Sequence, residues 1–190
     1  MENEDTITDE SDLIRAAIAG HSGAVEAALG REDVNLSDSD GWTALHIAAR
    51  NGNNDICRLL LSRPTIDVNV KNKWKSTPLM IAAGSGNLDV VELLLRHPRT
   101  QVDLQAEYYG RTALIEADKT GRNSALVEAI KNGHAHVATY LLRSGLVDFS
   151  DRDLRLQALI CCGSRGGDLM QAELNAAMKT FFRQMERIAS

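Results

Sequence analysis

The stretch from residue 40 to 61 returns in altered form from residue 73 to 95, and this repeat restricts the fold more than any other feature of the sequence. Thr43 and Thr77 are 34 residues apart (77 − 43), as are Gly52 and Gly86 (86 − 52). A period of this length is typical of proteins built from repeated supersecondary units. One such unit cannot bury its own apolar face, so neighbouring copies must stack. The period therefore predicts a solenoid.

The two copies carry matching signals for the start and end of a short helix. Thr43 is a typical N-cap, because its hydroxyl can accept a hydrogen bond from an otherwise unpaired backbone N–H. Thr77 stands in the same position one repeat later, and Pro78 suits the first helical position, where no backbone donor is needed. Gly52 and Gly86 are expected to end these helices in a left-handed conformation.

The apolar residues between these signals fall at helical spacing. Leu45, Ala48 and Ala49 share one face of the first helix, and the small alanines let a neighbouring helix approach closely. A second helix follows in each copy. Its apolar residues are Ile56, Leu59, Leu60 and Leu61 in one copy and Val90, Val91, Leu93, Leu94 and Leu95 in the next.

These motifs resemble ankyrin repeats. The resemblance rests on G-W-T-A-L-H-I-A-A-R-N-G at residues 41–52, S-T-P-L-M-I-A-A-G-S-G at residues 76–86, the triple leucine after each, and the ending Asp67-Val68-Asn69. It implies an all-α ankyrin-repeat solenoid of about five stacked helix-turn-helix units with short β-hairpin loops.

The same register divides the chain into three parts. Residues 1–11 are rich in Asp and Glu and are expected to form a disordered acidic tail. Residues 12–148 hold the ankyrin repeats, of which the first is divergent and more polar, as a terminal capping repeat should be. Residues 149–190 are interpreted as a degenerate last repeat and a long C-terminal capping helix. The apolar stripe of that helix is Met170, Leu174, Met178, Phe181, Met185 and Ile188.

The spacing breaks before the fourth repeat. Thr77 and Ser124 are 47 residues apart (124 − 77), which is 13 more than one period (47 − 34). We interpret residues 105–122 as an insertion that lengthens the preceding hairpin, because Ser124 restores the nine-residue spacing to Gly133 (133 − 124). In the alternative, Thr112 starts the helix and the insertion lies inside it.

One hairpin departs from the pattern of the family. Lys75 stands where Gly41 stands one repeat earlier. A lysine tolerates a positive φ poorly, so the sequence leaves the geometry of this turn open.

Composition and charge restrict the class of function. The net charge is −5, from 26 acidic and 21 basic residues, and this disfavours nucleic-acid binding, which needs a broad basic face. The three cysteines make no disulfide framework. No signal segment is evident, and no apolar run approaches the roughly 20 residues that span a bilayer. We therefore expect no membrane association and a cytoplasmic location, and a nuclear location also fits.

No motif predicts catalysis or cofactor binding, because the chain has neither a Gly-rich phosphate loop ending in Lys-Ser or Lys-Thr nor a nucleophile elbow. We therefore expect a protein that is not an enzyme and holds no cofactor. His134, His136, Cys161 and Cys162 offer metal-ligating groups, but no third ligand sits at zinc-like spacing, so no metal site is expected. The resemblance implies instead that His134 and His46 form hydrogen bonds within the stack.

The resemblance also implies where a partner binds. Proteins of this family grip partners with the hairpin tips and the outer end of each first helix, which together form a concave surface. The residues in these positions are Ser39, Asp40, Trp42, Arg50, Asn51, Lys73, Trp74, Ser76, Gly84, Ser85, Lys131 and Asn132. The inserted loop adds Tyr108, Tyr109 and Arg111, because an insertion on one face of a solenoid is often on its binding face.

Trp42 and Trp74 are the two tryptophans of the chain, and both fall in hairpins. Tryptophan and arginine dominate interface hot spots, which makes these side chains the leading candidates for partner contact. In the alternative, each ring packs on its own hairpin and only stiffens the stack. Lys71, Lys73 and Lys75 surround Trp74. They favour a partner with an acidic segment, or they form a solvated cluster that binds nothing.

These features predict a non-catalytic protein-interaction module, a monomer that serves as a scaffold, adaptor or inhibitor through its concave face. A second hypothesis treats the stack as a substrate, because Leu61, eight residues before Asn69 (69 − 61), resembles the pattern recognised by asparaginyl hydroxylases. A third makes the chain a regulatory subunit that docks by its C-terminal amphipathic helix on a partner or on a second copy, instead of using this helix to cap the stack. Binding of the helix to a membrane surface is the least favoured interpretation, because its basic residues are offset by Glu173 and Glu186.

Overall fold

The computed structural model describes residues 11–102, 106–107, 122–144 and the single residues 146, 176 and 183, and all structural statements below concern these residues. They contain eight helices and one pair of short strands. The helices are α1 (Asp12–Ala19), α2 (Ser22–Leu29), α3 (Ala44–Asn51), α4 (Asn54–Leu61), α5 (Pro78–Ser85), α6 (Leu88–Arg96), α7 (Ala125–Lys131) and α8 (Ala135–Arg143), and the strands are β1 (Ala106–Glu107) and β2 (Arg122–Asn123).

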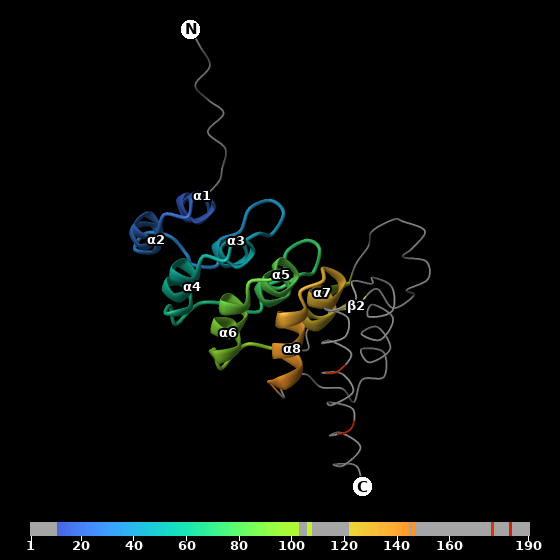
Figure 1. The fold of residues 1–190 in the computed structure, drawn as a ribbon. Helices are drawn as coiled ribbons and strands as arrows, with labels where there is room; N and C mark the ends of the chain where they lie inside the picture. The colour runs from blue at the N-terminus through green and yellow to red at the C-terminus, as the bar shows by residue number, and fades with distance from the viewer. Residues whose placement is uncertain are drawn as a thin grey trace.

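The helices form four pairs that stack side by side in chain order (Figure 1). The first helices of the pairs, α1, α3, α5 and α7, contact one another in sequence and make one layer. The second helices, α2, α4, α6 and α8, make the other layer. The prediction of an all-α repeat solenoid is therefore confirmed for the part of the chain that the structure describes.

The caps are those that the sequence predicts. The Thr43 hydroxyl accepts a hydrogen bond from the His46 backbone N–H at 3.4 Å, and the Thr77 hydroxyl accepts one from Met80 at 3.3 Å. Pro78 occupies the first helical position of α5. The caps Gly52 and Gly86 have φ values of 71° and 77°, so both helices end in the left-handed conformation that glycine adopts without strain.

The core lies between the two layers and between successive pairs. Alanines of α3 and α5 are fully buried, which lets the first helices approach closely, and leucines of the second helices fill the space beside them. His46 is buried as well. Its Nε2 lies 3.0 Å from the Ser76 carbonyl oxygen, and its Nδ1 lies 3.3 Å from the Thr43 backbone nitrogen. The expectation that His46 forms hydrogen bonds within the stack is confirmed.

The loops between the pairs contain little regular strand. The first is closed by an isolated bridge between Ser37 and Thr43, and the second by a bond from Asn72 N–H to the Ser76 carbonyl at 3.1 Å. In the second loop Lys75 has a φ of 59°, so the lysine does adopt the left-handed conformation that Gly41 adopts with a φ of 79°. The substitution of lysine for glycine leaves the turn geometry in place and adds strain to it.

The fourth pair begins after the predicted insertion. Ser124 caps α7, with its hydroxyl accepting a bond from the Val127 N–H at 3.4 Å. Just before it, β1 pairs with β2 in antiparallel register, with Ala106 opposite Asn123. Three of the predicted segments lie outside the described residues. They are most of the insertion, the acidic tail up to residue 10, and nearly all of the last repeat and C-terminal helix.

Two asparagines tie successive loops together. The Asn35 side chain donates to the Thr65 carbonyl at 2.9 Å and accepts from the Asp67 N–H at 2.7 Å. One repeat later, the Asn69 side chain donates to the carbonyl of Arg99 and accepts from the N–H of Gln101, at 2.7 and 2.9 Å. Each amide therefore uses its donor and its acceptor to hold the register between neighbouring repeats.

Candidate partner-binding groove

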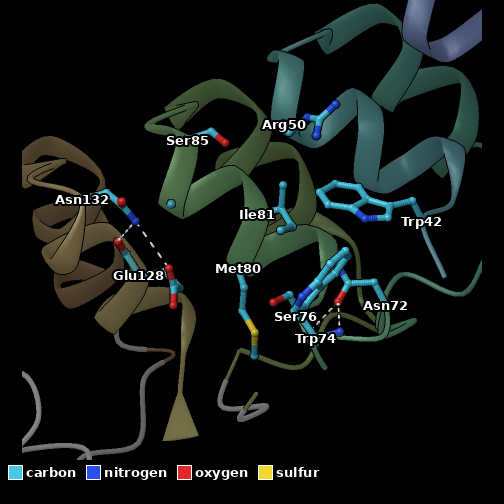
Figure 2. Close-up of a pocket in the computed structure, with 11 residues that line it drawn as sticks. Trp42, Arg50, Asn72, Trp74, Ser76, Met80, Ile81, Ser85, Glu128 and Asn132 are labelled. Atoms are coloured by element: carbon cyan, nitrogen blue, oxygen red, sulfur yellow. Dashed lines mark hydrogen bonds between the residues drawn. The ribbon is translucent and has the colours of Figure 1, made fainter. Parts of the chain in front are cut away.

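A groove of about 330 Å³ opens across three successive repeats (Figure 2). The second loop and α5 supply most of it, the hairpin before α3 and the end of α3 supply one side, and α7 supplies the other. Its lining residues are Trp42, Arg50, Asn72, Trp74, Ser76, Met80, Ile81, Gly84, Ser85, Glu128 and Asn132.

Both tryptophans of the chain meet in this groove. Their ring centroids lie 6.2 Å apart with an angle of 68° between the planes, which is an edge-to-face contact. The backbone N–H of Trp42 donates to the Asp38 carboxylate at 2.8 Å, and that of Trp74 donates to the Asn72 side-chain oxygen at 3.0 Å. Asp38 and Asn72 therefore fix each loop so that rings from neighbouring repeats come together.

The two rings differ in burial. Trp42 is partly buried and packs against the core and edge-on to the His46 ring, with 5.7 Å between centroids. Trp74 is 39% exposed and is one of four large apolar side chains that are exposed in the described residues. Trp42 therefore contributes to the stack as well as to the groove, whereas much of the Trp74 ring remains available for contact.

A positively charged side chain lies over each tryptophan ring. The Arg50 guanidinium carbon lies 4.8 Å from the Trp42 ring centroid, and the Lys73 ammonium lies 4.8 Å from that of Trp74. The Lys73 ammonium also forms an ion pair with the Asp40 carboxylate of the preceding hairpin. The guanidinium of Arg50, by contrast, has no hydrogen bond or ion pair with any described residue.

The far wall and the floor of the groove have a different character. Glu128 and Asn132 project from α7 opposite the tryptophans, as Figure 2 shows, and the Asn132 amide donates to the Glu128 carbonyl at 2.9 Å. Met80, Ile81 and Gly84 of α5 lie between the two walls. The groove is thus aromatic and basic on one side, apolar along part of its floor, and acidic on the other side.

Burial also explains the state of His46 behind Trp42. Removal from water lowers the pKa of His46, and hydrogen bonding to the Ser76 backbone and the charge of Asp38 oppose this only in part. A neutral ring with Nε2–H donating to Ser76 and Nδ1 accepting from Thr43 satisfies both contacts. His46 is therefore a structural residue that supports the Trp42 ring.

The structure brings about half of the predicted partner-binding residues together. The groove is lined by seven of them, namely Trp42, Arg50, Trp74, Ser76, Gly84, Ser85 and Asn132. Lys73 lies at its edge, over the Trp74 ring, and holds Asp40 there through their ion pair. Ser39, Asn51 and Lys131 do not line it. Tyr108, Tyr109 and Arg111 lie outside the described residues.

Four lining residues were not predicted from the sequence, namely Asn72, Met80, Ile81 and Glu128. The repeat register gives a signal for Asn72, because it stands 34 residues after Asp38 (72 − 38) and performs the same function in its loop. Asn72 is 3% exposed, and its Nδ2 has no hydrogen-bond partner in the described part of the chain. No sequence signal separates Met80 and Ile81 from ordinary core positions.

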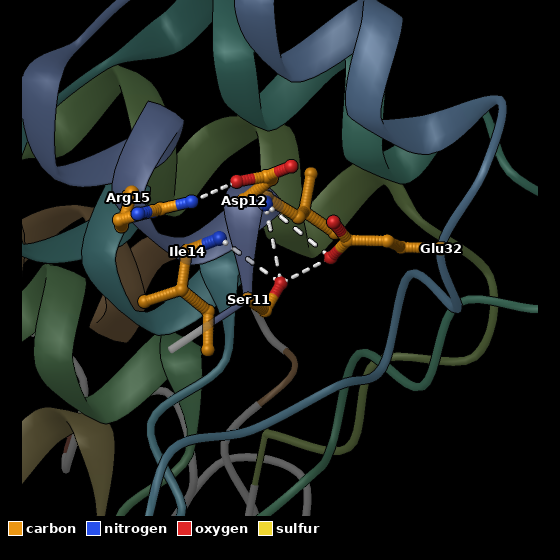
Figure 3. A network of polar contacts seen from close by, with 6 residues as sticks. Ser11, Asp12, Ile14, Arg15 and Glu32 are labelled. Atoms are coloured by element: carbon orange, nitrogen blue, oxygen red, sulfur yellow. Dashed lines mark hydrogen bonds and ion pairs between the residues drawn. The ribbon is translucent and has the colours of Figure 1, made fainter. Parts of the chain in front are cut away.

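A second polar cluster, at the start of the first repeat, is structural (Figure 3). The Ser11 hydroxyl caps α1 by accepting from the N–H groups of Leu13 and Ile14 at 3.1 and 3.4 Å, and it donates to the Glu32 carboxylate. Ser11 falls within residues 1–11, for which the sequence predicts a disordered tail. The prediction is wrong for Ser11, because this residue belongs to the first repeat as its N-cap and is held by a carboxylate that is distant in sequence.

The predicted modification site and the histidine pair also form bonds within the stack. The Asn69 amide is engaged at both ends, as described above, so hydroxylation there stays a prediction.

The two histidines of the fourth repeat contact the third. The Nε2 atom of His134 lies 3.1 Å from the Gly84 carbonyl oxygen of α5, and that of His136 lies 3.1 Å from the carbonyl oxygen of its cap, Gly86. The expected backbone bond of His134 is confirmed. Among described residues, no group of three metal-ligating side chains gathers.

Comparison with known proteins gives the family. The family model described as ankyrin repeats (3 copies) matches residues 2–72 and 64–153. No curated protein matches the chain in sequence. None of the helices in the described part has the length and apolar character that crossing a membrane requires. The stacked helix pairs and the family match together show that the chain belongs to the ankyrin repeat family, whose repeats are generally non-catalytic modules for protein–protein interaction.

Proposed function

We propose that this chain binds a protein partner in the groove between the two tryptophans and α7. The observation that supports the proposal is the meeting of Trp42 and Trp74 in one groove that draws on three successive repeats. Aromatic anchors beside an arginine are the usual composition of an interface hot spot. Trp42 also packs on the core, whereas much of the Trp74 ring is left available to a partner.

The exposure of Trp74 distinguishes binding from simple stiffening of the stack. A ring that only braced its own hairpin would gain most by being buried, yet Trp74 is 39% exposed. A partner side chain that covers this ring and the floor formed by Met80 and Ile81 would remove apolar surface from water. Partner binding therefore accounts for the exposed ring better than structural packing does.

The surroundings of the groove favour a partner with an acidic segment. Arg50 and Lys73 lie over the two rings, and Lys71 and Lys75 are exposed in the same loop as Trp74. Opposite charges steer association and suppress wrong partners more than they add affinity. The chain would act as a monomeric scaffold, adaptor or inhibitor, in the cytoplasm or the nucleus.

Affinity capture with matched variants tests the proposal. Wild type, W74A and the double variant W42F/W74A serve as bait, and R58A is the control, because Arg58 is exposed on α4 and does not line the groove. Phenylalanine at position 42 keeps a ring packed on the core. We expect proteins that bind wild type and R58A to be lost with the tryptophan variants, with a weakening of about 2 kcal/mol, or roughly thirtyfold, for the purified partner.

Unfolding measurements on the same variants separate the two explanations. If W74A left partner affinity unchanged but lowered the free energy of unfolding by more than about 1 kcal/mol, the ring would be a structural brace and the proposal would fail. Partners that bind the wild type and the double variant equally would also refute it.

A further inference from the structure

We infer that Arg50 selects partner segments in which a carboxylate side chain lies next to a large apolar side chain. This inference rests on the proposed function and names the side chains of the partner that the groove recognises. Such selection differs from a general attraction between the lysines and an acidic segment. Recognition depends here on the Arg50 guanidinium and on the apolar part of the groove beside it.

The size of the groove fits a single large side chain. Its volume of about 330 Å³ is at the lower end of the roughly 300–1,000 Å³ that small-molecule sites occupy. It would hold about ten water molecules at their liquid volume, so an aromatic or long aliphatic side chain fits inside it and would displace several of them. The edge of the Trp42–Trp74 pair and the side chains of Met80 and Ile81 give this occupant apolar contacts.

Arg50 is prepared to bind an anion. Its guanidinium carbon lies 4.8 Å from the Trp42 ring centroid, and this cation–π contact restrains the group without using its N–H donors in a hydrogen bond. No described residue accepts a hydrogen bond from it or forms an ion pair with it. A group that is already positioned loses less conformational entropy on binding, so a carboxylate would gain a bidentate contact at low cost.

The other cation beside the groove leaves Arg50 as the site for the carboxylate. Lys73 is already paired with Asp40, so it offers less to a second anion. The acidic side chain of the segment therefore lies at Arg50, at the end of α3, and its apolar neighbour lies against the tryptophan pair, Met80 and Ile81.

The arrangement favours a carboxylate over a phosphate. Phosphorylated segments are generally bound by clusters of arginines, which supply several charge-assisted hydrogen bonds to one group. Arg50 is the one arginine among the residues that line the groove. A single fork-shaped donor pair matches the two oxygens of Asp or Glu.

A displayed library of random dodecapeptides, panned on the intact wild-type chain, tests this inference. Affinities of selected peptides are measured by the fluorescence anisotropy of a dye on each peptide, a signal that does not depend on the two tryptophans of the chain. W74A and W42F/W74A are measured in the same way, to show whether a peptide occupies the groove. Each peptide is compared with the version in which Asp or Glu is replaced by Asn or Gln. The protein variants are R50Q, R50K and the control R58Q, which makes the same charge change at an exposed position outside the groove.

A second variant, N72D, places a negative charge in the groove wall without altering Arg50. Asp38 shows that the loop accepts a carboxylate at this register position, because its oxygen receives the N–H groups of Asp40 and Trp42 just as the Asn72 oxygen receives those of Trp74 and Ser76. We expect N72D to weaken peptides with a carboxylate and to spare their amide versions. Far-UV circular dichroism checks that every variant remains folded.

The inference predicts selected peptides that share a carboxylate beside an aromatic or long aliphatic residue. Their binding should weaken about tenfold in R50Q and in the amide peptides, less in R50K, and not in R58Q. If the peptides need Trp74 but show no acidic preference and bind R50Q normally, the inference is overturned while the proposed function stands. A stronger response to phosphorylated peptides than to carboxylates would likewise overturn it. If no selected peptide depends on either tryptophan, both proposals fail.

Discussion

Exchanging one side chain at the same position of two successive loops should change stability in opposite directions. Gly41 and Lys75 stand 34 residues apart (75 − 41) and have φ values of 79° and 59°. We expect K75G to stabilise the protein, because it removes a side chain from a conformation that disfavours one. We expect G41A to destabilise it, because it introduces a side chain into the same conformation.

The magnitudes follow from the geometry. The left-handed conformation costs a residue other than glycine about 1–2 kcal/mol, whereas a new glycine costs about 0.5–1 kcal/mol in chain entropy. The net gain for K75G is therefore about 0.5–1 kcal/mol. In G41A the added Cβ would also lie 3.0 Å from the Asn72 Cα and 3.2 Å from the Lys73 nitrogen. These are backbone atoms that cannot rotate away, and we expect a loss of about 2–3 kcal/mol.

Urea unfolding followed by far-UV circular dichroism measures both effects, with the change in midpoint multiplied by the common slope. K75N is the control, because asparagine tolerates the left-handed conformation better than lysine does and is expected to lie between K75G and wild type. A loss of stability in K75G, or an unchanged midpoint in G41A, would show that the loop relaxes to another conformation and would refute the reasoning.

Three further predictions concern buried and bridging groups. Burial lowers the pKa of His46, so below pH about 6.5 the unfolded chain binds a proton that the folded chain does not, and stability falls on acidification. Replacement by glutamine removes the titrating group and keeps an acceptor for the Thr43 N–H. The free energy of unfolding of H46Q, measured by urea titration at each pH, should therefore fall less between pH 7 and 5 than that of wild type. The difference between the two slopes should be at most about 1.4 kcal/mol per pH unit. Truncation of the Asn69 amide in N69A should cost about 1–2 kcal/mol of unfolding free energy, as should N35A, because each removes a donor and an acceptor between repeats. Burial raises the pKa of Cys57 to about 12, so peptide mass spectrometry should show no labelling of this thiol at pH 8 until urea unfolds the chain.

The helix ends could be predicted from the sequence because their physical causes are local. A threonine hydroxyl reaches an N–H three residues away, and a glycine takes its left-handed conformation from its own lack of a Cβ. The caps at Thr43, Thr77, Gly52 and Gly86 therefore lie where the sequence predicts them. The Ser11 cap has an equally local cause, because its hydroxyl accepts from the N–H groups of Leu13 and Ile14, so the same rule would have found it. Only its contact with the Glu32 carboxylate, 21 residues away, has no local signal.

The groove could be predicted only in outline. The repeat register places Trp42 and Trp74 in neighbouring loops, but their edge-to-face contact depends on how one repeat is rotated against the next. The same rotation brings Glu128 and Asn132 of the fourth repeat opposite the tryptophans. The placement of Arg50 over Trp42 depends on side-chain rotamers, which no spacing rule specifies.

The bonds between neighbouring repeats also determine how the chain assembles. Those at the Asn35 and Asn69 bridges join groups 30 to 32 residues apart, whereas those from His134 and His136 to α5 and its cap span 50 residues. Contacts of such limited reach in sequence favour rapid folding that spreads from one repeat to the next. Closing the longer connection costs only about 0.4 kcal/mol more than closing an ordinary one, because loop entropy grows with the logarithm of length. Residues can therefore be gained or lost between α6 and α7 with little effect on the docking of the fourth repeat, which leaves that connection free to change in evolution.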